Sequence, residues 1–165
     1  MSYEMNPSDI FVYGKNGEMY STIKSVMAGN GRLSEFDFQF LTAMFGVGQR
    51  EFPEEKKENT YSTISRVSYG RNSIEFDIRF GLVTILRNLS DEYTDLVNNK
   101  AFVKNSNGEK YSELPNVGAF YGSLNAGVPA LYEVLNVYDI RDDKSAFDAL
   151  NDYLDSEYSE VEKLV

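Results

Sequence analysis

The sequence contains no cysteine, no histidine and no tryptophan among its 165 residues. The absence of cysteine excludes disulfides, thiolate nucleophiles and zinc sites built on sulfur. The absence of histidine excludes Ser-His-Asp triads and imidazole acid–base catalysis. Because the side chains of the commonest catalytic centres are missing, we expect a protein that is not an enzyme.

Long apolar runs are missing as well. No stretch approaches the ~20 consecutive apolar residues that a membrane-spanning helix needs. Residues 1–7 have neither the basic nor the apolar part of a secretory signal. The lack of cysteine is consistent with a reducing compartment. The sequence therefore predicts a cytoplasmic protein that has no membrane partner.

Motifs for phosphates, cofactors and metals are also absent. Neither the GxxxxGK[ST] loop nor a GxGxxG loop between a strand and a helix occurs, and we interpret Gly29-Asn30-Gly31 as a turn. Asp139, Asp142 and Asp143 lack the glycine and the late glutamate of a calcium-binding loop. We interpret them as solvated acids ahead of a helix. We expect no cofactor and no metal.

Two carboxylate pairs leave a weak enzymatic alternative open. Glu35 with Asp37 and Glu75 with Asp77 have the same spacing, and paired carboxylates can hydrolyse glycosides or bind metal. Such a pair is not specific unless it converges on a pocket. We favour the interpretation that these acids form an outward polar face.

Negative charge is abundant and unevenly distributed. The net charge is −10, and residues 139–165 contain nine acids against three bases, a net of −6. Such a chain repels the phosphate backbone of nucleic acids and the surface of anionic membranes. The electrostatically favoured partner is a protein with a basic surface, and direct nucleic-acid binding is not expected.

Three stretches of the chain begin alike. Nine residues after an aromatic residue, each has a Tyr-Ser-x-(Ile/Leu) element; the aromatic residues are Phe11, Phe52 and Phe102, and the elements start at Tyr20, Tyr61 and Tyr111. A period of about 40 to 50 residues is typical of repeated structural units. We predict a single domain, 1–165, with a degenerate threefold repeat whose units are 10–50, 51–100 and 101–140.

Within each unit we expect a turn and then a short helix capped by serine. The caps would be Ser21, Ser62 and Ser112, and apolar residues at i, i+3 follow each of them. Strict alternation of apolar and polar residues favours strands at 35–40 and 74–80. The helical alternative stays open there because Ser34 and Asn72 are plausible caps.

Longer helices are predicted where apolar residues recur every 3.6 positions. One covers 81–98, and another begins near Pro129. Pro115 is placed in the first turn of the short helix of the third unit. A C-terminal amphipathic helix is predicted over 143–164, with an apolar face that includes Phe147, Leu150 and Leu154.

Taken together, these patterns predict an α+β domain that ends in an acidic amphipathic helix. For its function we expect a non-enzymatic protein-protein interaction or assembly protein, and the many Asn, Tyr, Lys and Ile residues suggest a phage-encoded one. The expected protein-binding residues are Asp148, Asp152, Asp155 and Glu162. The alternative is an acidic inhibitor that mimics nucleic acid and occupies the basic groove of a host enzyme. The oligomeric state stays open.

Overall fold

The computed structural model describes residues 10–29, 33–49, 60–64, 73–102, 115–137 and 142–162. In chain order the elements are β1 (Ile10–Tyr13), α1 (Gly14–Met27), α2 (Glu35–Gly46), β2 (Thr60–Ile64), α4 (Ser73–Arg87), α5 (Tyr93–Asp95), the π-helix η1 (Leu96–Ala101), α6 (Pro115–Val137) and α7 (Asp143–Glu162). The expected α+β class is wrong, because the described residues are almost entirely helical. Their two strands are 4 and 5 residues long and form one antiparallel pair.

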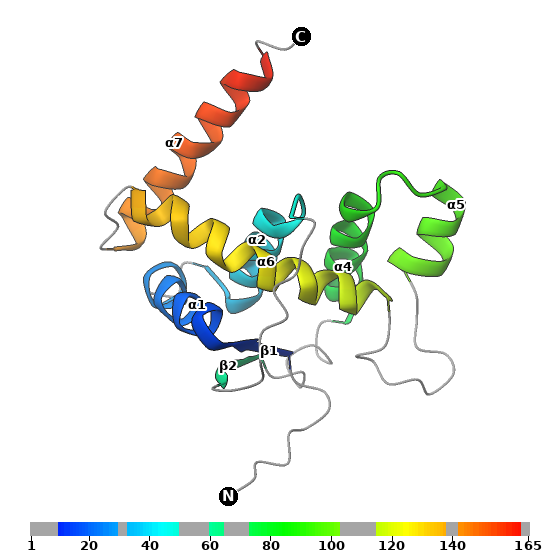
Figure 1. The fold of residues 1–165 in the computed structure, drawn as a ribbon, viewed down its shortest axis with the longest axis horizontal. Helices are drawn as coiled ribbons and strands as arrows, with labels where there is room; N and C mark the ends of the chain where they lie inside the picture. Colours follow the sequence, from blue (N-terminus) through cyan, green and yellow to red (C-terminus); the bar gives the residue numbers. More distant parts are fainter. Residues whose placement is uncertain are drawn as a thin grey trace, which may run out of the picture.

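Helix α6 is the central element, and the other helices pack around it (Figure 1). It contacts α1, α2, α4, α7 and η1. Leu124, Val128 and Leu131 of α6 are fully buried. Phe120 of the same helix packs against Phe80 of α4, with ring centroids 4.6 Å apart. Contact on several sides explains why α6 is apolar around most of its circumference.

The strand predicted at 35–40 is the first half of helix α2. Ser34 caps this helix, since its Oγ accepts a hydrogen bond from the Asp37 backbone N–H at 3.1 Å. Phe38 is fully buried, while Phe36 and Phe40, one turn apart, pack partly buried on another side of the helix. An alternating aromatic pattern therefore arises from a helix that is covered on more than one side.

The strand predicted at 74–80 is likewise wrong, because these residues lie in helix α4. The two helices are joined by an ion pair in which Arg79 Nη2 lies 2.6 Å from Asp37 Oδ1. The Arg79 guanidinium also lies 5.5 Å from the centroid of the Phe40 ring. Asp37 in α2 therefore has a cationic partner from the neighbouring helix α4.

We expect the contribution of Asp37 to the stability of the protein to depend on pH. The Ser34 hydroxyl and then Arg79 hold the pKa of its carboxyl below the ordinary value. A lowered folded-state pKa adds stability above the unfolded pKa of about 3.9, and this stability is lost as the pH falls through the folded value. We expect Asp37→Asn to reduce the free energy of unfolding at pH 7 by ~0.2–1 kcal/mol, because the pair is partly exposed. In urea unfolding the difference should shrink below pH 4, and a pH-independent difference would contradict this origin.

The threefold repeat is also wrong at the level of its elements. Tyr20 and Ile23 lie inside helix α1, whereas the matching segment Thr60–Ile64 is strand β2. β2 pairs with β1, with Phe11 opposite Thr63. The third matching segment, 111–114, lies outside the described residues, as does Phe52. Two chemically similar segments therefore adopt different structures.

The predicted serine caps at Ser21 and Ser62, and the turn expected at the start of the first unit, are also wrong because these residues lie inside other elements. Ser21 lies in the middle of α1, Ser62 lies in β2, and Ser112 is outside the described residues. The sequence Gly14–Gly17 does not form a loop but the first turn of α1, which follows β1 directly. Gly14 has a φ of 54°, a left-handed value that glycine adopts without strain and that lets the strand turn sharply into the helix.

The remaining helix boundaries are partly confirmed. The predicted helix 81–98 is interrupted, because α4 ends at Arg87 and Glu92 caps a new helical segment by accepting from the Asp95 N–H at 2.8 Å. Pro115 begins α6 as expected, but Pro129 lies inside that helix and not near a start. The C-terminal helix predicted over 143–164 is confirmed as α7 over Asp143–Glu162, and residues 163–164 lie outside the described residues. Among the described helices, none combines the length and the apolarity that crossing a membrane requires.

Candidate functional site

The start of α7 is fixed by a reciprocal cap. Asp142 Oδ1 accepts from the Ser145 backbone N–H at 2.8 Å, and Ser145 Oγ accepts from the Asp142 N–H at 3.2 Å. The hydrogen bond from the Ser145 backbone is the main reason that the pKa of the Asp142 carboxyl is lowered. Asp142 thus acts as a helix cap. No group of three metal-ligating side chains occurs in the part of the chain that the structure describes.

In the part of the chain that the structure describes, the first half of α7 is the more deeply embedded half. Ala146, Ala149 and Leu150 are buried, and the helix packs there against α6 and α1. Beyond Leu150 the helix extends away from the other elements (Figure 1). Leu154, on the same face one turn later, has 57% of its surface exposed. The apolar stripe of α7 therefore continues past the point where the described protein covers it.

An apolar groove lies between this stripe and helix α2. Its volume is about 580 Å³. It is lined by Leu33, Leu41, Met44, Phe45, Phe147, Leu150, Asn151, Tyr153 and Leu154. Across it, the rings of Phe45 and Tyr153 have centroids 5.7 Å apart. Because Asn151 and the Tyr153 hydroxyl supply the only polar side-chain atoms of this lining, the groove is suited to apolar side chains. We call it the α2–α7 groove.

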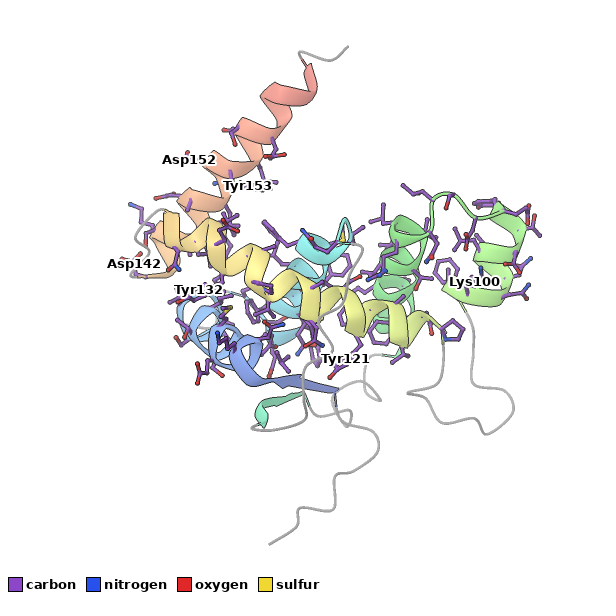
Figure 2. All side chains as sticks on the ribbon, in the orientation of Figure 1. Lys100, Tyr121, Tyr132, Asp142, Asp152 and Tyr153 are labelled. Atoms are coloured by element: carbon purple, nitrogen blue, oxygen red, sulfur yellow. The ribbon has the colours of Figure 1, made fainter. Side chains whose placement is uncertain are left out.

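The predicted acidic residues border this groove. Asp148, Asp152 and Asp155 are exposed, and their i, i+4, i+7 spacing places them along one side of α7. On a helix this side adjoins Asn151, at the edge of the groove lining. Figure 2 labels Asp152 and Tyr153 on the projecting part of α7. We call Asp148, Asp152 and Asp155 the acidic stripe. Glu162 is the last residue of α7, and its side chain lies outside the described residues.

The α2 wall of the groove was not found from the sequence. Its residues Leu41, Met44 and Phe45 follow the i, i+3, i+4 spacing of a helix face. That signal was available, but the strand predicted at 35–40 obscured it. Met44, in this wall, has 37% of its surface exposed.

A second hollow, of about 380 Å³, lies between α4, η1 and α6. Its two cations already interact within the fold. Lys100 Nζ lies 2.8 Å from Asp91 Oδ2 and 3.3 Å from Asp95 Oδ2. Arg87 donates a hydrogen bond to the Ser123 hydroxyl at 3.1 Å, and burial lowers the pKa of its guanidinium. We therefore assign no ligand to this hollow.

The comparisons with known proteins add no relative. No protein-family model matches the sequence, and no curated protein or solved structure is significantly similar to it. The α2–α7 groove with its acidic border is the surface feature of the described residues that is suited to binding a partner.

Proposed function

We propose that this protein is a non-enzymatic interaction or assembly protein that binds a partner protein with a basic surface. The α2–α7 groove beside the acidic stripe carries the proposal. Apolar surface that a helix leaves uncovered marks interaction sites in many proteins. An acidic border gives such a site a preference for cationic partners and speeds their association.

The acidic stripe also supports a second candidate, mimicry of nucleic acid. A mimic presents carboxylates along one face to a basic groove that normally holds phosphates. Such a ligand has no need of an apolar groove next to its charges. Met44 and Leu154, both exposed, lie in that groove. Their position therefore favours protein docking over mimicry.

The acidic stripe provides the test of the proposed function. We expect replacement of Asp148, Asp152 and Asp155 by Asn to leave the fold intact, because exposed charges contribute little to stability. The same variant should retain less partner protein from native cell extract. Binding by the wild type should weaken with added salt, since charges are screened beyond ~8 Å at physiological ionic strength. Circular dichroism and partner affinity at two salt concentrations measure both effects.

A control at exposed acids outside the groove tests whether the position of the removed charges matters. Glu18 in α1 and Glu133 in α6 are exposed acids outside the groove, and their joint replacement by Gln should leave partner binding close to that of the wild type. If the triple variant binds its partner as well as the wild type, and salt has no effect, the acidic stripe is not a binding surface. Partners that are nucleic-acid enzymes displaced by DNA would favour mimicry instead.

A further inference from the structure

The α2–α7 groove has walls that restrict what can occupy it. Both walls are helices, so their backbone N–H and C=O groups are largely engaged in their own hydrogen bonds. A bound extended segment would find no backbone hydrogen-bond partners in these walls, because they offer no open strand edge. A helix satisfies its backbone internally. The occupant that fits the chemistry of these walls is therefore a helix.

The lining also defines the pattern that the occupant must present. Phe147, Leu150 and Leu154 form the apolar row of α7, at i, i+3 and i+7. From the first to the last, this row rises about 10 Å, or two helical turns. A helix lying against it needs two or three apolar side chains on one face, at i, i+3 or i+4, and i+7.

The charge of α7 favours a partner protein over a second copy of this chain as the occupant of the groove. In the part of α7 whose side chains are described, four exposed acids, Asp148, Asp152, Asp155 and Glu157, stand against one exposed base, Lys144. Two copies that packed through α7 would bring these acids together, and the whole chain has a net charge of −10. Lysines or arginines beside the apolar face of an incoming helix would instead meet opposite charge.

From these observations we infer that the α2–α7 groove binds a basic amphipathic helix of a partner protein. Its apolar side chains enter between Met44 and Leu154, and its flanking Lys or Arg side chains face Asp148 and Asp152. This inference rests on the proposed function and specifies the class of partner and the place where it docks.

The test uses a defined probe and the full-length protein. The probe is a fluorescein-labelled peptide of about 18 residues, with Leu on one helical face and Lys elsewhere. The control peptide has the same composition in an order that scatters the leucines around the helix. Fluorescence anisotropy should show the amphipathic peptide binding at least about tenfold more tightly than the scattered one, because only it presents a continuous apolar face.

Two matched protein variants locate the binding site. Leu154→Glu and Leu89→Glu each add one negative charge at an exposed leucine, 57% and 72% exposed respectively, and only Leu154 lines the groove. Leu154→Glu should weaken peptide binding by about tenfold or more, although the added charge attracts the peptide, because it places a carboxylate among apolar contacts. Leu89→Glu should bind like the wild type. Circular dichroism and thermal unfolding confirm that both variants fold.

Three results would overturn the inference: equal affinity for both peptides, equal affinity of the two variants, or a wild-type dimer in sedimentation velocity that Leu154→Glu abolishes. The last result would assign the groove to a second copy of this chain.

Failure of the proposed function can be distinguished from failure of this inference. If native extract yields a partner that depends on the acidic stripe but the peptide does not enter the groove, only the helical inference is wrong. If the peptide binds and no protein is retained from extract, the proposed function is wrong.

Discussion

Gly127→Ala is expected to destabilise the protein severely, by about 3 kcal/mol or more, at the upper end of what overpacking usually costs. Helices α2 and α6 touch here backbone to backbone. A Cβ added at Gly127 would overlap the Thr42 carbonyl oxygen and lie 2.9 Å from the Gly46 nitrogen. Gly46 of α2 faces α6 in the same way, because a Cβ added there would overlap the Ser123 carbonyl oxygen. Backbone atoms cannot move aside as a flexible side chain can, so the two helices would have to separate.

Gly118→Ala is the matched control in the same helix. A Cβ at Gly118 would meet nothing within 4 Å, and the residue is exposed. We expect this change to stabilise the protein by ~0.5–1 kcal/mol, because alanine restricts the unfolded chain and favours the helix. Chemical unfolding of both variants measures the contrast. Near-wild-type stability of Gly127→Ala would mean that α2 and α6 do not cross at these glycines.

Phe38→Ala is expected to have an effect of comparable size, ~3–5 kcal/mol of lost stability. Phe38 is fully buried, and its ring centroid lies 5.1 Å from that of Tyr20 in α1. Removing the ring would leave a cavity between α1 and α2 that the surrounding core can fill only partly. Urea unfolding, analysed as a two-state transition, measures the loss.

Alanine substitutions elsewhere in α2 test whether this segment is a helix. Phe36 and Phe40 are partly buried, so their replacement should cost less than that of Phe38. Met44→Ala should cost less still, under about 1.5 kcal/mol, because 37% of that side chain is already exposed. In a strand, Phe36, Phe38 and Phe40 would share one face and lose similar amounts. Equal losses at the three phenylalanines would therefore contradict the helix.

Helix α7 could be predicted from the sequence because local signals agree with its tertiary environment. Its apolar residues keep helical spacing, and Asp142 and Ser145 form the cap that starts it. The segments Tyr20–Ile23 and Tyr61–Ile64 show the opposite case. Thr and Ile are compatible with both helix and strand. Burial of Tyr20 and Ile23 in the core favours the helix in α1, whereas pairing with β1 favours the strand in β2. The tertiary contacts of each segment thus determine whether it forms a helix or a strand. Local sequence similarity contains no information about these contacts, so the repeat inferred from it was wrong.

One part of the candidate site could likewise be predicted from the sequence, and the other part could not. The acidic stripe could be read directly from the sequence, because exposed acids at helical spacing depend on one helix alone. The α2–α7 groove depends on two elements that are about 100 residues apart in the chain and on the distance at which they meet. Alternating aromatics in 35–40 also occur in half-buried strands, and that ambiguity hid the helical face that contains Leu41, Met44 and Phe45.

The projection of α7 determines how far from the protein its charge is felt. A helix of 20 residues is about 30 Å long, and among the described residues of α7 the buried ones lie in its first turns. Electrostatic influence decays over ~8 Å in physiological salt, so carboxylates on the projecting turns create a field in solvent farther out than the other described elements extend. A cationic molecule approaching by diffusion would meet this field before it meets the body of the protein. If the proposed function holds, the projecting helix enlarges the volume from which a cationic partner is drawn to the protein.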